Sequence, residues 1–231
     1  MIDGGRETGR LLALLQFSDG LFPAGGFAHS FGLETYVQSG PVRDGPTLQT
    51  FLVAHLEGMA GPCDAAAAVR AAETSALPQW MEIDARLEAM KCVPEFRDAS
   101  GQMGRQTLRA AAALGPDPAL GDLDTAIEAG ATPGHHAMVF GAVVGRAGIH
   151  REVVATAYLY SSTALLVNAA LRLLPLGQVE GQRILAGMRP RIVRLAARAA
   201  VATLDDLWSF APGLERAGLV HAGLEARLFR S

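Results

Sequence analysis

The chain has 231 residues, half of them hydrophobic, so it is long enough and apolar enough to bury a sizeable core. Its formal net charge of -3 argues against a protein that binds nucleic acid non-specifically, because such proteins need a surplus of basic side chains to displace counterions from phosphate. Its two cysteines are too few for a four-cysteine zinc site or a disulfide framework, and they favour a reducing, cytoplasmic setting.

The opening residues, MIDGGRETGR, include an acidic side chain and no apolar core, so they do not resemble a signal peptide. We expect residues 1–8 to form a disordered arm. Apolar residues recur at helical spacing through the rest of the chain, whereas the alternating pattern of strands is scarce. Helices are predicted over residues 10–17, 27–38, 48–59, 63–76, 80–90, 96–114, 119–130, 136–147, 151–174 and 178–206.

Proline and glycine set the limits of these helices. The third helix is expected to end at Gly61 and Pro62, and Pro190 to kink or split the last one. The connecting segments are short and rich in Gly and Pro, so none resembles an interdomain linker. We therefore predict an all-α fold, a single domain over residues 1–231 with about ten helices and flexible N- and C-terminal segments.

Residues 153–171 carry no charge and are nearly long enough to span a bilayer. Tyr158, Tyr160 and a Ser-Ser-Thr run lie at the middle of this segment, where the hydrocarbon would be deepest, and Asn168 adds an amide. The sequence favours a helix buried inside a helical protein, with a membrane span as the alternative.

No motif predicts catalysis. The segment Gly20 to Phe27 begins like a phosphate loop but lacks the Lys-Ser/Thr pair that contacts phosphate and magnesium, and no nucleophile elbow is present. None of the six histidines forms an HExxH pair, so no permanent metal site is predicted. Adjacent His135 and His136 diverge by about 100° on a helix, so at most one can face a given site.

One charged pattern stands out on the last long helix. Arg191, Arg194 and Arg198 fall near one helical face, which suits either contact with an acidic partner or simple exposure to solvent.

Four segments carry distinctive motifs: LFPAGGFAHSFGLETY from Leu21 to Tyr36, EFRDASGQMG from Glu95 to Gly104, RLLPLGQ from Arg172 to Gln178, and HAGLEARLFRS from His221 to Ser231. In this order they resemble signatures of the UreF family of urease accessory proteins. The four matches span almost the whole chain. The tail departs from the family pattern at Ala222, where the family usually has Glu or Thr.

The resemblance implies an all-α, non-enzymatic protein that dimerises, binds the accessory protein UreD/UreH and the GTPase UreG, and helps to deliver nickel to apo-urease. UreG would bind and hydrolyse GTP, while this chain would gate that activity and provide part of a nickel passage. No permanently bound cofactor is then expected. His135 and His136 are ordinary helix-start or surface histidines or, as the alternative, could contact nickel in transit.

The resemblance also suggests roles for individual residues. Residues 209–231 would form a partner-binding C-terminal tail, beginning its family motif at His221, in which Arg227 helps to recruit UreG and Leu228 and Phe229 anchor it. A frayed terminus is the alternative. The remaining candidates could contact partners or be ordinary helix-surface residues; they are Glu34, Tyr36, Arg97, Ser100, Arg105 and Gln178.

Two other functions remain open at this stage. One is a helical metal-dependent hydrolase whose site is assembled across helices, with His135 or His136 among the ligands. The other is the membrane protein considered above.

Overall fold

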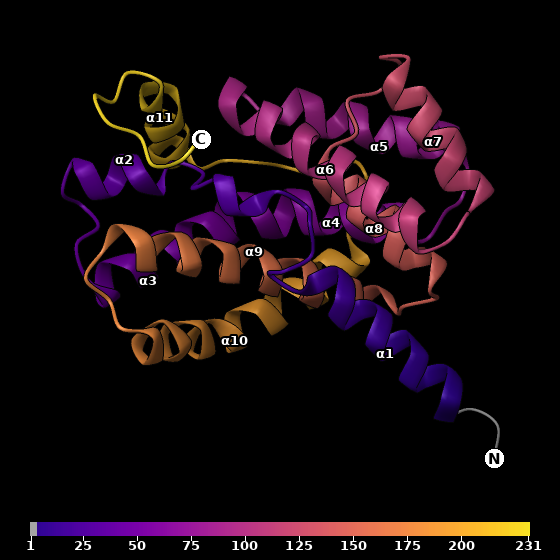
Figure 1. Ribbon diagram of the computed structural model, residues 1–231, viewed down its shortest axis with the longest axis horizontal. Helices are drawn as coiled ribbons and strands as arrows, with labels where there is room; N and C mark the ends of the chain where they lie inside the picture. The colour runs from indigo at the N-terminus through magenta and orange to yellow at the C-terminus, as the bar shows by residue number, and fades with distance from the viewer. Residues whose placement is uncertain (1–3) are drawn as a thin grey trace.

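The computed structural model describes residues 4–231, and in this part of the chain every regular element is helical (Figure 1). The elements are α1 (Gly4–Ser18), the 3-10 turn η1 (Gly26–Ala28), α2 (Leu33–Gln38), α3 (Gly45–His55), the π-helical segment η2 (Leu56–Ala65), α4 (Ala66–Ala72), α5 (Leu77–Met90), α6 (Pro94–Leu114), α7 (Pro118–Glu128), α8 (His136–Arg146), α9 (Arg151–Leu173), α10 (Gln178–Val201) and α11 (Pro212–His221). The predicted all-α fold class is confirmed.

Two close helix pairs organise the core. The long helices α9 and α10 form a hairpin, and α4 packs against α8, which in turn packs against α6. The contact between α4 and α8 is close because Gly141 and Gly145 of α8 face the backbone of α4 at Ala68 and Ala72. No side chain larger than hydrogen fits at these crossing points.

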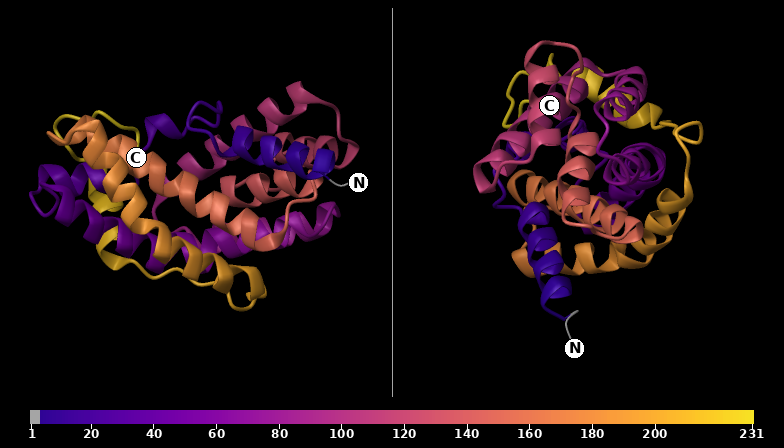
Figure 2. Two further views of the ribbon diagram at one scale, coloured as in Figure 1. Left: turned by 90° about the horizontal axis from the view of Figure 1, so that it is seen from below. Right: turned by 90° about the vertical axis from the view of Figure 1, so that its right-hand side faces the viewer.

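The helix α9 occupies the centre of the molecule (Figure 2). By length and composition it is the one described helix that is long and apolar enough to cross a membrane, but 56% of its most apolar window is buried inside the protein. A core helix passes the same test of length and composition. Leu159 and Leu166 have no exposed surface, as expected for the buried helix that the sequence favours.

The predicted stop at Gly61 and Pro62 is wrong, because the chain stays helical from α3 through η2 into α4. Proline has no N–H for an α-helical bond, and the wider π-helical turn accommodates it. The segment after α10 forms a hydrogen bond with η2, because the Phe210 N–H donates to the Gly58 carbonyl at 2.8 Å. A contact distant in sequence therefore helps to keep this stretch helical.

The predicted helix over residues 27–38 is interrupted. Phe31 and Gly32 both have positive φ angles, of 49° and 85°, which a right-handed helix does not allow, so only η1 and α2 are helical. Pro190 lies inside α10 without splitting it, and that helix ends at Val201 rather than at residue 206.

The start of α1 and the C-terminus lie far apart (Figures 1 and 2). Residues 4–8 of the expected disordered arm belong to α1, and residues 1–3 lie outside the described part of the chain. Within the expected C-terminal tail, residues 212–221 form α11, a helix that the sequence did not predict, and the backbone of Leu228 and Phe229 bonds to Glu34 of α2.

Candidate functional site

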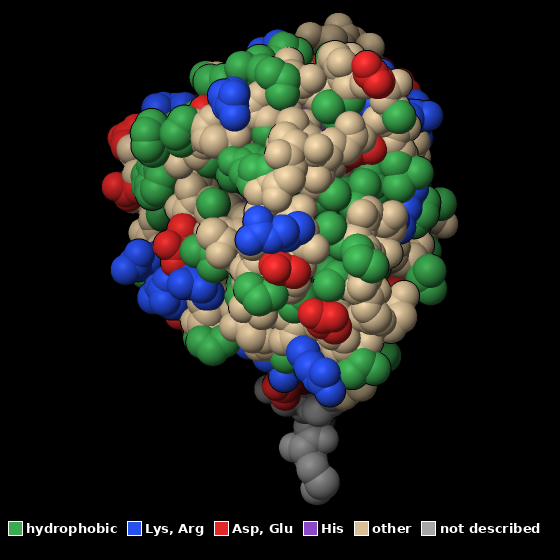
Figure 3. All heavy atoms as spheres, turned by 90° about the vertical axis from the view of Figure 1, so that its left-hand side faces the viewer, with side chains coloured by type: hydrophobic (Ala, Val, Ile, Leu, Met, Phe, Trp, Pro, Cys, Tyr) green, Lys and Arg blue, Asp and Glu red, His purple; other side chains and the backbone are tan. Residues whose placement is uncertain are grey.

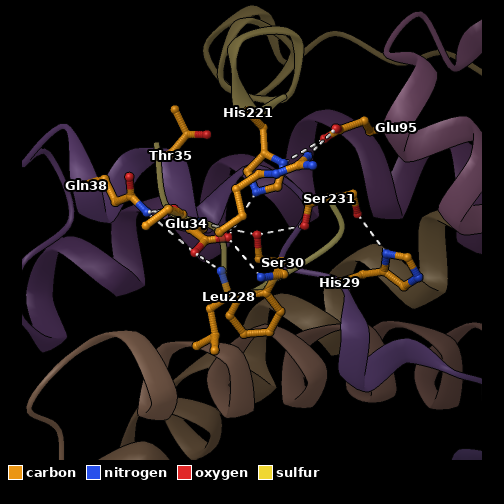
Figure 4. A network of polar contacts seen from close by, with 12 residues as sticks. His29, Ser30, Glu34, Thr35, Gln38, Glu95, His221, Leu228 and Ser231 are labelled. Atoms are coloured by element: carbon orange, nitrogen blue, oxygen red, sulfur yellow. Dashed lines mark hydrogen bonds and ion pairs between the residues drawn. The ribbon is translucent and has the colours of Figure 1, made fainter. Parts of the chain in front are cut away.

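A cluster of polar contacts fixes the end of the chain to the body of the protein, and we name it the tail clasp (Figure 4). Its centre is Glu34, in the first turn of α2, whose side chain is almost completely buried. The Glu34 carboxylate accepts from the backbone N–H of Leu228 at 2.6 Å and of Phe229 at 3.1 Å. Glu34 therefore replaces the hydrogen bonds that these two tail amides would otherwise make with water.

His221, the last residue of α11, completes the tail clasp. Its Nε2 lies 3.0 Å from Glu34 Oε2, and its Nδ1 lies 2.7 Å from Glu95 Oε2 at the start of α6. The imidazole is fully buried between the two carboxylates. Glu95 also pairs with the Arg227 guanidinium at 3.0 Å, so the tail clasp joins α2, α6, α11 and the tail.

Charge and hydrogen bonding act together on Glu34. Burial alone would raise the pKa of its carboxyl, but the Leu228 N–H, the His221 ring and the Phe229 N–H outweigh burial and lower that pKa below its ordinary value. Glu34 is thus an ionised group when the tail is docked at neutral pH, which strengthens each hydrogen bond that it accepts.

A second set of contacts holds the last residue, Ser231. Its carbonyl oxygen accepts from the N–H groups of Ser30 and Phe31, and its hydroxyl lies 2.9 Å from His29 Nδ1. Burial, and then the positive charge of Arg230, lowers the pKa of His29 to about 4, so this ring is neutral at pH 7. The tail is packed along the segment before α2, in contrast to the frayed terminus considered as an alternative.

Two neighbouring tail residues proposed to anchor a partner have opposite environments. Phe229 is 4% exposed and its ring lies against the Arg172 guanidinium, 4.3 Å from ring centroid to Cζ. Leu228 is 52% exposed. Phe229 therefore anchors the tail to its own chain in this structure, and Leu228 and the partly exposed Arg227 are the side chains available to a partner.

Glu34 and Tyr36, both candidates from the first motif, are not simple surface residues. Glu34 is buried in the tail clasp, so the alternative of ordinary helix surface is wrong for it. Tyr36 is half-buried, packs edge-on against Phe51 and has its phenol beside Gly213 at the start of α11.

The candidates on α6 make separate contacts. Arg97 pairs with Glu88 of α5 at 3.5 Å, and Arg105 donates to the Pro133 carbonyl at 3.3 Å. Ser100 is buried, and its hydroxyl accepts from the backbone N–H of His136. Gln178 is exposed and opens α10, as the sequence allowed. Their roles toward partners stay predictions.

His135 and His136 face different neighbours, but the helical geometry expected for the pair does not apply, because His135 is the extended residue that precedes α8. His135 is buried, and its Nε2 lies 2.9 Å from Glu88 Oε2. His136 instead faces Tyr158 of α9, with ring centroids 5.6 Å apart. Burial lowers the pKa of His136 to about 4, which leaves the neutral imidazole that can ligate a metal ion.

His136 lines a cavity of about 490 Å³, which also reaches His55 and the ion pair of Lys91 with Asp64. The Lys91 ammonium lies 2.7 Å from the Asp64 carboxylate. No group of three or more His, Cys, Asp or Glu side chains in residues 4–231 is arranged to hold a metal ion. Contact of His135 or His136 with nickel in transit stays a prediction.

Three residues for which no role was predicted lie in or beside the tail clasp. Glu95 and Arg172 lie inside two of the family motifs, so the motifs could have marked them as candidates. The motifs do not indicate which residues they contact. His29 lies in the first motif, 202 residues before the serine that it contacts. Nothing local in the sequence indicates that pairing.

Comparisons with known proteins support one family. The UreF family model matches residues 42–189. A urease accessory protein UreF from Bacillus sp. (strain TB-90) is 34% identical over 96% of this chain and 99% of its own length. Proteins of the same description from Jannaschia sp. (strain CCS1) and Arthrobacter sp. (strain FB24) are 34% and 32% identical, covering 99% and 95% of this chain and 97% and 96% of their own lengths.

Proposed function

Because this chain belongs to the UreF family of urease accessory proteins, we propose that it works as an adaptor that joins UreD/UreH to the GTPase UreG and gates GTP hydrolysis during nickel delivery to apo-urease. Nickel is the cargo of that complex, and GTP binds to the partner UreG. We further propose that the adaptor has no catalytic role, acts in the cytoplasm and forms a homodimer.

The observation that carries this proposal is the docked tail. The tail clasp buries His221 and Phe229 while it leaves Leu228 and Arg227 at the surface, so the tail has a defined shape before any partner arrives. A preorganised surface loses less conformational entropy on binding than a free terminus does. The arrangement therefore supports recognition of a partner by the tail.

The surface around the tail clasp also suits a protein partner. On the side of the molecule that carries α2, α3 and α11, hydrophobic side chains are interspersed with Lys, Arg, Asp and Glu (Figure 3). Interfaces of proteins that associate reversibly have this mixed character. The same face offers exposed apolar side chains on α11 itself, at Leu219 and Val220.

The metal-dependent hydrolase has less support. His136 lies near Asp64 and Lys91 at the cavity, but the grouping of three ligands that a catalytic metal site needs is not found among the described residues. The adaptor is therefore the function that we propose.

The test is capture of purified UreD/UreH and UreG by this chain, in wild-type form and as Arg227→Ala. We expect the wild type to capture both partners, and Arg227→Ala to keep UreD/UreH and lose UreG. The ion pair of Arg227 with Glu95 is partly exposed and contributes at most about 1 kcal/mol, so the tail should stay docked without it.

Arg216→Ala is the matched control, because Arg216 is an exposed arginine on α11 for which the described residues provide no ion-pair partner. Failure of the wild type to capture either folded partner would reject the adaptor role. Equal UreG capture by Arg227→Ala and wild type would reject only the role given to Arg227.

A further inference from the structure

The arginines of α10 border a groove that the tail clasp does not include. Their spacing in the sequence left open whether Arg191, Arg194 and Arg198 meet an acidic partner or only solvent. In the structure, the last turns of α10, the π-helical segment η2 and the chain after α10 enclose a space of about 530 Å³. We name it the α10 groove, and we define it by six residues of its lining, Glu57, Gly61, Arg194, Arg198, Asp206 and Trp208.

The backbone of η2 gives the α10 groove its shape. This segment is π-helical over ten residues, and π-helical turns are rare in proteins and frequent at functional sites. Gly61 lets η2 approach α10 closely, because a Cβ at this position would lie 3.2 Å from the Leu195 side chain. Leu195, Ala199 and Ala202 make part of the lining apolar. The fold thus forms a hollow that can receive an apolar side chain.

Trp208 is the largest side chain of the α10 groove, and its backbone is fixed. Its N–H donates to the Pro62 carbonyl at 3.5 Å, and the Phe210 N–H donates to the Gly58 carbonyl at 2.8 Å, so this chain segment is bonded to η2. Trp208 is 49% exposed, and its indole N–H has no hydrogen-bond partner among the described residues. Tryptophan is enriched among the residues that dominate binding energy at protein interfaces.

One guanidinium of the α10 groove is left without a carboxylate. Arg191 and Arg194 share a single oxygen of Glu57, at 2.7 and 2.6 Å. The Asp206 carboxylate accepts two hydrogen bonds from within its own turn. Arg198 has no carboxylate within 4.0 Å in the described part of the chain. Arg198 is therefore the arginine of the groove that is available to a ligand.

The positive charge extends along the helix. α10 carries five arginines and one acidic residue, whereas the whole chain has a net charge of -3. This helix attracts a carboxylate of another protein, and the planar guanidinium of Arg198 can bind that carboxylate through two hydrogen bonds. Because Arg198 and the apolar lining border the same hollow, the groove suits a carboxylate that lies next to an apolar side chain.

We infer that the α10 groove is a second docking site and that its occupant is an acidic segment of a partner protein. An apolar side chain of that segment packs beside Trp208, and a neighbouring Asp or Glu carboxylate pairs with Arg198. α10 and α11 lie on opposite sides of α9 (Figure 1), so the groove and the tail clasp present separate surfaces. The site goes beyond the proposed function, since it lets the chain hold a further protein while the tail is occupied.

The first test measures binding of the full chain to a short fluorescein-labelled peptide in which a central leucine is flanked on both sides by glutamates. Arg198→Glu should raise the dissociation constant at least about tenfold, because it removes a charge-assisted hydrogen bond and places a like charge in the groove. The matched control is Arg183→Glu, the same change of charge at an exposed arginine of α10. Arg183 lies about four turns, roughly 22 Å, from Arg198, beyond the Debye length of about 10 Å at 0.1 M salt.

Two further variants test the roles of charge and ring separately. Glu57→Gln removes the carboxylate that two arginines share, so the acidic peptide should bind about threefold more tightly, the order expected for one charge near the surface. Trp208→Phe keeps a ring but lacks the indole N–H, and it should weaken binding less than Trp208→Ala does. Thermal unfolding of each variant shows whether its fold is intact.

Loss of peptide binding in Arg198→Glu, with tighter binding in Glu57→Gln and no change in Arg183→Glu, supports the site. Four results would overturn it. They are equal binding of the peptide and its glutamine counterpart, equal losses in Arg198→Glu and Arg183→Glu, unchanged or weaker binding in Glu57→Gln, and displacement of the peptide by free glutamate at the same concentration. Self-association that Arg198→Glu abolishes while it leaves peptide binding unchanged would assign the groove to a second copy of this chain, and would overturn the inference as well.

Discussion

Glu34→Gln should release the tail while leaving the helical body folded. The carboxylate of Glu34 accepts two tail N–H groups and faces the His221 ring, and the Glu34 and His221 side chains are almost completely buried. Glutamine keeps the size of the side chain but has one oxygen, and its amide NH₂ group must face a donor. At least one hydrogen bond to a charged acceptor is lost and a buried donor is left without a partner.

The loss in the free energy of tail docking follows from these contacts. A hydrogen bond to a charged group contributes about 1.5–3 kcal/mol, and an unsatisfied buried donor costs about 1–3 kcal/mol more. We expect tail docking to weaken by about 2.5–6 kcal/mol, which corresponds to an increase in tail opening of about 70-fold to 25,000-fold. The global unfolding midpoint should change less, because the tail is a peripheral segment.

The assay is hydrogen exchange at the Leu228 and Phe229 amides, with Glu82→Gln as the control because Glu82 is an exposed glutamate on α5. The folded-state pKa of Glu34 is lowered from its ordinary value of 4.5, so its contribution is present above that pH and is lost as the pH falls through the lowered pKa. The wild-type protection factors of these amides, which are corrected for the pH dependence of intrinsic exchange, should therefore fall in acid, and the variant should lack that Glu34-dependent decrease. Wild-type exchange rates in Glu34→Gln at neutral pH would refute this account of the tail clasp.

Two further predictions concern the stability of the body. His29 and His55 are buried and His136 is partly buried, and burial is the main cause that lowers the pKa of each from 6.5 to about 4. Their neutral forms therefore stabilise the fold above pH 6.5, and this contribution is lost as the pH falls toward 4. The free energy of unfolding by urea should fall by about 2 kcal/mol or more between pH 7 and pH 5, and a flat or rising midpoint would contradict this. Gly141→Ala should lower the melting temperature by at least about 4 °C, because its new Cβ would overlap the backbone of α4, whereas Gly187→Ala on α10 meets no atom within 4 Å and should be neutral or stabilising. Equal melting temperatures for the two variants would contradict the prediction, because α4 and α8 could then move apart with little loss of stability.

The fold class could be predicted because helical periodicity is a local property. The spacing of apolar residues placed most of the long helices, including α6, α8 and α9, within a few residues of their positions. These positions depend on neighbours three or four residues away, which the sequence shows directly. The argument that His135 and His136 diverge as neighbours on one helix was wrong in its premise, since His135 is extended and α8 begins at His136.

Helix boundaries predicted from nearby residues were wrong in two places where a segment distant in sequence forms a hydrogen bond. The Gly61 and Pro62 pair signals a helix end, yet η2 continues through it with a carbonyl bonded to Phe210, about 150 residues later. The motif around Phe31 looked helical, but the chain turns there through positive φ angles and presents its N–H groups to Ser231. In both places the backbone conformation differs from the prediction and forms a hydrogen bond with a distant segment.

The sequence by itself determined that this is an all-α chain with the ordered signatures of one family, and it identified the tail as a segment of interest. Only the tertiary structure decided that Phe229 faces inward and Leu228 outward, and that Glu34 meets His221 across 187 residues. The physical reason is that periodicity is encoded by near neighbours, whereas burial and pairing of a polar side chain depend on which elements pack beside it. The tail clasp exists only once α2, α6 and α11 have come together.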